Sequence, residues 1–399
     1  MMPTLWSDNA PAAFWSVQRN IPDAAWQDAI REAAPVLGLP ALPQDQEAVL
    51  AQVLGEAQFG AGHWKLTPVK RLYYAVKPLV PQAFRNWLHE LHRERVGGTF
   101  PLGWPIEDRY VLFQHEVLRR LLLTTGAEDL PFVHFWPGGH CFAFVLTHDV
   151  ETAAGQANVR AVADLEEGLG FRSSFNFVPE RYPLDAALID ELRDRGFEIG
   201  VHGLYHDGKL FSSHREFMRR AERINGHLHA LQAVGFRSPL MLRNPEWLQA
   251  LDIEYDLSFF DTDPCQPMPG GVMTIWPFTL GRFIELPYTL MQDCTVTRLL
   301  GETTPRLWLQ KVDFIARNMG MALVNTHPDY LVKPATGRVY ADFLRTMASR
   351  ADCWHAQPRE VARWWRVRPS SPPGASVARA LLANGGHDAP QITCELSAE

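Results

Sequence analysis

The feature that most constrains this chain is a regular alternation of strand-like and helix-like segments that begins at Cys141. Residues 141–151 form an apolar, β-branched run that ends in polar residues, which is typical of a buried strand whose end reaches a cleft. Helix-like and strand-like segments then alternate at 159–170, 172–178, 184–196, 197–203 and 214–235, and further ones follow at 255–260, 282–288, 308–320 and 321–327. This rhythm predicts a mainly parallel sheet or a closed barrel with helices outside, in which chemistry gathers where the strands end.

The sequence on either side of this core predicts a different organisation. Residues 1–135 mix helix-like stretches with aromatic and proline-rich connections and show no catalytic spacing, so we predict a mainly helical N-terminal subdomain. Helices are expected there at 23–38, 82–96 and 114–123. The sheet domain would then occupy 136–340, with C-terminal helices at 341–368 packed on it and a flexible tail of linker composition at 369–399.

Charge and hydropathy exclude several classes of partner. The 399 residues are 46% hydrophobic and 21% charged, which is typical of a globular protein. A formal charge of −7 gives no broad attraction to phosphate backbones, so we expect no nucleic-acid partner. No stretch is apolar for the roughly 18 residues of a membrane span, and the start lacks the pattern of a secretory signal, which predicts no integral membrane segment and a cytoplasmic protein. The five cysteines are widely spaced without a CxxC pair, so we predict reduced structural thiols.

Two acids lie at the end of the first predicted strand. Asp149 and Glu151 are two residues apart, so the period-2 geometry of a strand points both carboxylates to one side. Paired acids on one face need a cation or a shared proton, because like charges repel.

Two histidines follow the end of a later predicted strand. His202 and His206 are four residues apart, a spacing that lets two imidazoles bind one ion if the loop turns helically. Two histidines and one carboxylate leave open positions for water and substrate. Each pair alone is more often a solvated edge or ordinary core, but their occurrence together at two strand ends favours a metal site.

Four motifs carry a resemblance to a known family: LTHDVE (146–151), HGLYHD (202–207), GFRSP (235–239) and LVNTH (323–327). In this order and at these intervals they resemble the motifs of polysaccharide deacetylases of the NodB-homology type, also called family-four carbohydrate esterases. The resemblance covers about residues 140–330. The flanking WPF, ELPYTL, MALVNTHPDYL and VARWWR are similar to a bacterial subgroup associated with exopolysaccharide biosynthesis. The resemblance implies an α/β fold, namely a distorted (β/α) barrel with a mainly helical N-terminal region and C-terminal helices.

The resemblance also implies roles for individual residues. Glu151, His202 and His206 would bind a divalent metal, for which Zn²⁺ is the expected species. Where the commoner form of the first motif places two adjacent aspartates, Val150 follows Asp149 here, so the ligand would come from Glu151. Two alternatives stay open at this point: Asp149 could bind the metal instead, and His148 competes for either role.

The remaining roles implied by the resemblance concern proton transfer. Asp149 would be the catalytic base, Arg237 would orient it by a charged hydrogen bond, and His327 would be the general acid. FFDTDP offers Asp261 and Asp263 as the acid that adjusts the histidine, and we favour Asp261. The fifth motif departs from the pattern, since Asn325 stands two residues before the histidine where the family has a hydrophobic residue.

The expected activity is therefore hydrolysis of a carbon–nitrogen bond other than a peptide bond. The substrate would be the N-acetyl group of an N-acetylated sugar in a polysaccharide or its biosynthetic intermediate, so the expected partner is an N-acetylated glycan or glycan precursor. Two alternatives remain. The same scaffold could hydrolyse another amide, such as a ureide-type compound, and the altered first and fifth motifs also fit a catalytically silent glycan-binding protein. The sequence does not determine the oligomeric state.

Overall fold

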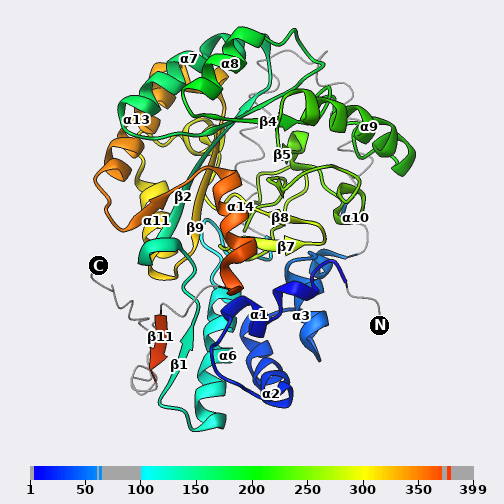
Figure 1. Ribbon diagram of the computed structural model, residues 1–399, viewed down its shortest axis with the longest axis vertical. Coiled ribbons are helices and arrows are strands. Elements are labelled where there is room, and N and C mark those ends of the chain that lie inside the picture. Colours follow the sequence, from blue (N-terminus) through cyan, green and yellow to red (C-terminus); the bar gives the residue numbers. More distant parts are fainter. Residues whose placement is uncertain (1–3, 61–62, 65–99, 371–374, 379–399) are drawn as a thin grey trace.

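The centre of the molecule is a curled sheet whose strands are almost all parallel (Figure 1). The computed structural model describes residues 4–60, 63–64, 100–370 and 375–378. The strands of this sheet are β2 (Phe142–Val150), β3 (Ser174–Phe177), β4 (Glu198–His202), β5 (Gly235–Arg237), β6 (Tyr255–Asp256), β7 (Phe278–Leu280), β8 (Phe283–Glu285), β9 (Met321–Thr326) and β10 (Cys353–His355). Hydrogen-bonded neighbours in the sheet follow the order β10-β2-β3-β4-β5-β6-β8-β7. β9 lies outside this order and pairs with β2.

The curl brings the two sides of the sheet together. β9 pairs in parallel with β2 from Ala143↔Met321 to His148↔Thr326. On the other side, the chain after β8 returns to β9 through the isolated parallel bridge between Leu290 and Val324. The sheet therefore forms the distorted (β/α) barrel that the sequence predicted. Among its described strands, only β7 departs from parallel pairing, since it is antiparallel to β8.

Helices cover the outside of the barrel, which explains why its strands are so apolar. All nine residues of β2 are buried, as expected for a parallel strand with both faces covered. The covering elements are α7 (Ala153–Gly168), α8 (Ala186–Asp194), α9 (His214–Ala230), α10 (Pro245–Leu248), α11 (Arg306–Arg317), α12 (Pro328–Leu331), α13 (Pro334–Ala348) and α14 (Pro358–Val367), with short turns at η5 (Pro137–Gly139), η6 (Pro239–Met241), η7 (Thr295–Leu299) and η8 (Arg368–Ser370). The first helix after β2 begins where the Thr152 hydroxyl accepts a hydrogen bond from the Gly155 amide, 3.0 Å away.

The N-terminal region forms a mainly helical layer at one end of the barrel (Figure 1). It contains η1 (Ser7–Asn9), α1 (Pro11–Trp15), α2 (Asp23–Ala33), η2 (Ala34–Leu37), α3 (Gln46–Val53), η3 (Ala57–Phe59), α6 (Arg109–Thr125) and β1 (Asp129–Phe132). The helix expected at 23–38 corresponds to α2 and η2, and the one expected at 114–123 lies inside α6. The helix expected at 82–96 lies outside the described residues.

The C-terminal segments differ from the predicted boundaries. The boundary at 340 falls inside α13, and β10 adds a strand to the sheet, so 341–368 supplies more than helices. Part of the predicted tail also pairs with another strand, because β11 (Ala375–Ala378) is antiparallel to β1. Across the described part of the chain, none of the helices combines the length and the apolar character needed to cross a membrane.

Candidate active site

Polar side chains from four strand ends meet at one edge of the barrel. β2 carries Asp149 and is followed by Glu151, β4 ends at His202, β5 ends at Arg237, and His327 follows β9. Because these strands are parallel, their carboxyl ends open on the same side of the sheet. Glu151 keeps 26% of its side chain exposed, whereas the other four are almost fully buried. Five of the six residues that the sequence nominated for the metal, the base, its orienting arginine and the acid are therefore close neighbours.

A tight loop brings the second histidine back to the first. The backbone has positive φ at Gly203 (64°) and at His206 (55°), so the loop turns in a left-handed conformation and not as the helical turn expected from the spacing. A Cβ at Gly203 would lie 2.4 Å from the ring of Pro239, so only glycine fits there. The result is that the rings of His202 and His206 lie 5.1 Å apart, centre to centre.

The geometry of Glu151, His202 and His206 fits a bound cation. One ligand atom from each residue lies within 4.8 Å of the other two. His206 Nε2 is 2.9 Å from Glu151 Oε1, yet among the described residues neither histidine Nε2 makes a hydrogen bond although both atoms are buried. Buried polar atoms without partners are costly, and here they converge on one point. A divalent metal would satisfy them.

The protonation state of His202 also suits a ligand. Its Nδ1 lies 3.1 Å from the Arg237 carbonyl oxygen, so Nδ1 carries the proton and the lone pair is on Nε2. Burial lowers the pKa of His202 to about 4, against the attraction of Asp149, so the imidazole is neutral at physiological pH.

The geometry favours Glu151 over its two competitors as the carboxylate ligand. Both oxygens of Asp149 already accept hydrogen bonds from Arg237 and Asn325. His148 points away from the site, where its ring nitrogens lie 2.7 Å from Glu166 and 2.7 Å from Thr326. This follows from the period of two in β2, which places residue 148 on the face opposite Asp149.

Asp149 is held as a carboxylate by its neighbours. Arg237 Nη1 donates to Oδ1 over 3.0 Å, Asn325 Nδ2 donates to Oδ2 over 2.8 Å, and Asn176 Nδ2 lies 3.3 Å from Oδ1. Burial alone would raise the pKa of Asp149, but the charges of Arg237 and His327 and the hydrogen bond from Asn325 outweigh it and hold this pKa well below its usual range. Asn325, the departure in the fifth motif, thus acts as a second donor to the candidate base.

His327 is paired with Asp293, a residue that the sequence reasoning missed. Asp293 Oδ1 lies 2.8 Å from His327 Nδ1, and its other oxygen accepts a hydrogen bond from the His327 amide over 3.0 Å. Burial opposes the charge on His327, but Asp293 and then Glu151 and Asp149 raise its pKa to about 9. His327 is therefore protonated at neutral pH, with Nε2 facing Glu151 at 3.8 Å.

Asp261, which we expected to adjust His327, has another partner. Its Oδ2 lies 2.6 Å from the ammonium group of Lys311 on α11, and both side chains are buried. Asp263 accepts a hydrogen bond from the Tyr288 hydroxyl. The acid that contacts the histidine is instead Asp293, which follows the strand-like segment at 282–288. A search for acids after every predicted strand, not only in the motif, would have found it.

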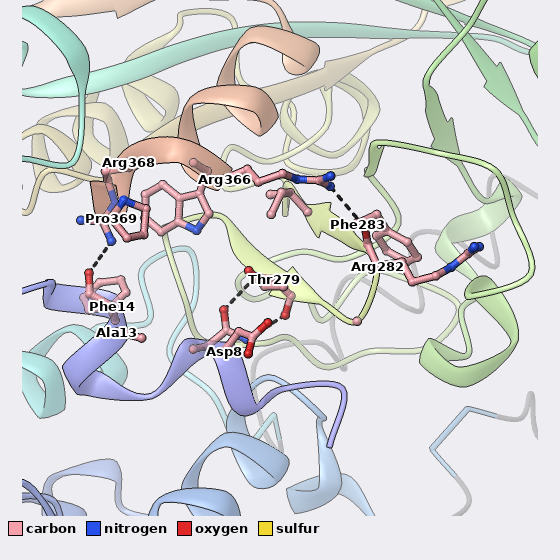
Figure 2. A pocket seen from close by; sticks show the side chains of 13 residues that line it. Asp8, Ala13, Phe14, Thr279, Arg282, Phe283, Arg366, Arg368 and Pro369 are labelled. Atoms are coloured by element: carbon pink, nitrogen blue, oxygen red, sulfur yellow. Dashed lines mark hydrogen bonds between the residues drawn. The ribbon is translucent and has the colours of Figure 1, made fainter. Parts of the chain in front are cut away.

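A separate cavity of about 380 Å³ lies between α1, the β7–β8 hairpin and α14 (Figure 2). The buried Arg368 lines it and donates hydrogen bonds to the carbonyl oxygens of Val133 and Phe14. None of the candidate catalytic residues lines this cavity. The chemistry is therefore assigned to the strand ends.

Comparison with known proteins gives structural neighbours at low sequence identity. A protein from Mycobacterium smegmatis described as a polysaccharide deacetylase has a TM-score of 0.48 and 18% identity, over 60% of this chain and 94% of that one. A polysaccharide deacetylase described from Pseudomonas aeruginosa PAO1 has a TM-score of 0.49 and 16% identity, over 59% and 95% of the two chains. The Puue allantoinase has a TM-score of 0.48 and 15% identity, over 60% and 95%.

Two of these three neighbours are described as polysaccharide deacetylases, the family that the four motifs of this chain resemble. A further neighbour, from Bordetella bronchiseptica, is described as a polysaccharide deacetylase involved in O-antigen biosynthesis, with a TM-score of 0.36 and 19% identity over 62% of this chain and 91% of that one. No family model and no curated protein matches the chain.

Proposed function

We propose that this protein is a metal-dependent deacetylase that hydrolyses the N-acetyl group of an N-acetylated sugar in a polysaccharide or its biosynthetic intermediate. The observation that carries the proposal is the convergence of Glu151, His202 and His206 between a carboxylate, Asp149, and a protonated imidazole, His327. A base and an acid on either side of one cation site suit addition of water to an acyl group followed by loss of the leaving group.

Glu151, His202 and His206 would hold the metal, and two imidazoles with one carboxylate are a ligand set that suits Zn²⁺. The cation supplies Lewis acidity, which polarises the acyl oxygen and makes a water molecule easier to deprotonate. The buried, unpartnered Nε2 atoms of both histidines support this assignment.

The chain's own residues would move the protons. Asp149 accepts the proton of the attacking water, while Arg237 and Asn325 keep its carboxylate aimed at the cleft through bonds of 3.0 and 2.8 Å. The attack converts the acyl carbon to a tetrahedral intermediate. The proton on His327 Nε2 then passes to the nitrogen of the substrate as the carbon–nitrogen bond breaks.

The charge on His327 is the reason to prefer an amide over an ester as the substrate. An amide anion is a very poor leaving group, so the nitrogen must receive a proton before it departs. Asp293 keeps that proton on His327 at neutral pH by raising its pKa to about 9. General acid catalysis of this kind contributes about 10²- to 10⁴-fold to the rate.

An acetate-release assay tests the proposal. The purified protein is loaded with Zn²⁺ and given N-acetylhexosamines, short N-acetylated oligosaccharides and, as the rival class, allantoin and small cyclic amides. Acetate should appear from the sugars and stop when a chelator is added. Hydrolytic ring opening of the cyclic amides alone, followed by chromatography, would replace the proposal by the ureide-type alternative, and glycan binding without any hydrolysis would favour the silent homologue.

Variants separate metal binding from proton transfer. Ala in place of Glu151, His202 or His206 should reduce zinc content measured by elemental analysis, because each removes a ligand. His327→Ala should keep the zinc and lower turnover by about 10²- to 10⁴-fold. Asp149→Asn should also keep the zinc and lose activity. Full zinc in Glu151→Ala with loss of zinc in Asp149→Asn would assign the ligand to Asp149 instead.

A further inference from the structure

Tyr330 lies directly beside the candidate general acid. α12 begins at the residue after His327, and this single turn places the Tyr330 ring 5.2 Å from the His327 ring, centre to centre. Tyr330 is half-buried, so part of it faces the solvent at the edge of the site.

Two cations flank this tyrosine. The guanidinium carbon of Arg298 and the ammonium nitrogen of Lys333 each lie 5.0 Å from the centre of the Tyr330 ring. Both side chains are exposed, and within the described residues neither forms an ion pair or a side-chain hydrogen bond. Two other exposed arginines of this helical layer do have acidic partners: Arg306 pairs with Glu302 and Arg345 pairs with Asp342.

The segments that carry the two cations are the ones that carry the candidate acid and its partner. Arg298 lies in η7, a π-helix that begins two residues after Asp293. π-helical turns are rare and occur frequently at functional sites. Lys333 lies six residues after His327, at the start of α13. A hydrogen-bond contact of 3.1 Å between the hydroxyls of Thr297 and Thr336 joins η7 to α13 and so holds the two cations on one rim.

Two positive charges around one ring repel each other, and no described carboxylate forms an ion pair with either of them. Exposed cations are often simply hydrated, and each contact with the ring face stabilises by only about 0.5–1 kcal/mol. Their position decides between the two interpretations. Two hydrated cations could lie anywhere on the surface. Cations that bind the substrate must lie close to the candidate acid, as Arg298 and Lys333 do beside Tyr330.

We propose that Arg298 and Lys333, positioned by Tyr330, form an anion subsite that selects an N-acetylated sugar carrying a phosphate or carboxylate group. The inference rests on the proposed deacetylase function and names its substrate class. Guanidinium binds the oxygens of either anion in a two-pronged fashion, and ammonium adds a point charge. Neutral N-acetylated sugars would be poorer substrates.

Three matched substrates test this inference with the zinc-loaded, full-length protein. They are N-acetylglucosamine 1-phosphate, the methyl glycoside of N-acetylglucosaminuronic acid, and the neutral methyl glycoside of N-acetylglucosamine. The wild-type protein should deacetylate one or both anionic sugars with a kcat/KM at least about fivefold above that of the neutral sugar, mainly through KM. The preference should shrink as sodium chloride is raised, because the subsite is exposed.

The double variant Arg298→Gln, Lys333→Gln should bring the anionic-to-neutral ratio close to one. The matched control is Arg317→Gln, Arg338→Gln, which removes the same charge from exposed positions on α11 and α13 and should keep the wild-type preference. Preference for only the phosphate or only the carboxylate would support the subsite and identify its anion.

The failures can be told apart. Acetate release with no preference for an anionic sugar, or a preference that survives the double variant, would overturn the subsite and leave the deacetylase proposal standing. Absence of acetate from all three sugars and from the panel described above would overturn both.

Discussion

Asp149 and Glu151 are of similar chemistry and lie two positions apart. Their different proposed roles, base and metal ligand, therefore follow from the groups that surround each carboxylate. Asp149 is enclosed by donors, among them Arg237 and Asn325. Glu151 faces two imidazole nitrogens that have no hydrogen-bond partner. An acid surrounded by donors is suited to remain charged and receive a proton, while one that faces lone pairs is suited to share a cation with them.

Asp293→Asn should move the alkaline limit of activity to lower pH. A raised pKa means that the acid form of His327 is present below about pH 9 and is lost as the pH rises through that value. Removing the Asp293 charge should lower that limit by about 1–3 pH units. The measurement is kcat against pH for both zinc-loaded proteins, so that the cation contributes equally to each.

Asp261→Asn serves as the comparison, because its carboxylate pairs with Lys311 and not with His327. It should leave the alkaline limit in place, with folding checked by circular dichroism. A shift of the limit in Asp261→Asn and none in Asp293→Asn would return the role to Asp261.

At the scale of elements, a buried ion pair joins the N-terminal layer to the loops that follow β5 and β6. Glu56, between α3 and η3, accepts hydrogen bonds from Arg243 Nε over 2.8 Å and from the Gly271 amide over 2.9 Å. The Arg243 guanidinium carbon lies 4.5 Å from the centre of the Phe260 ring. Both charged side chains are fully buried, so each depends on the other for compensation.

Glu56→Gln should destabilise the protein by about 3–5 kcal/mol at neutral pH, because it leaves Arg243 buried without a counter-charge. Burial would raise the pKa of Glu56, but Arg243 and His63 lower it to about 2. The carboxylate therefore stabilises the fold above its unfolded pKa of 4.5, and this contribution is lost as the pH falls toward 2. Denaturant unfolding at several pH values measures both effects.

The matched control is Glu32→Gln, which breaks an exposed pair with Arg120 and should cost less than about 1 kcal/mol. Equal free energies of unfolding for Glu56→Gln and the wild type at neutral pH would show that the buried pair does not hold the two regions together.

At the scale of the whole molecule, the candidate metal site connects parts of the barrel that are far apart in the sequence. Its ligands come from the ends of β2 and β4, and the barrel itself closes through β9 and the chain after β8. A cation held at this edge binds the folded barrel and not the unfolded chain, so its binding energy adds to the stability of the fold.

Zinc should therefore raise the melting temperature of the wild-type protein. At free zinc about 100 times the dissociation constant, the gain is about 2.7 kcal/mol. Differential scanning calorimetry of the chelator-treated and zinc-loaded forms measures it. The gain should persist in His327→Ala and disappear in His206→Ala, and an equal gain in both variants would place the stabilising zinc elsewhere.

Much of the fold and part of the candidate site could be predicted because their signals are local. An apolar run such as 141–151 indicates a buried strand whatever surrounds it, and parallel strands bring their ends to one edge, so Asp149, Glu151, His202 and His206 could be nominated together. The short strands gave weaker signals. β7 is three residues long and antiparallel, and β10 and β11 lie in segments whose composition indicated helices and a tail.

The sequence by itself determined the order of most strands and helices of the barrel, because hydrophobic periodicity is a property of neighbouring residues. The tertiary structure alone decided which distant side chains touch. Asp293 and His327 are 34 residues apart, and Arg237 and Asp149 are 88 apart. Such pairs depend on how far the sheet curls and on which face each side chain leaves its strand, and packing over the whole barrel sets both. For that reason the sequence could place both Asp261 and Asp293 after strand-like segments, but only the tertiary structure shows that Asp293 contacts the histidine.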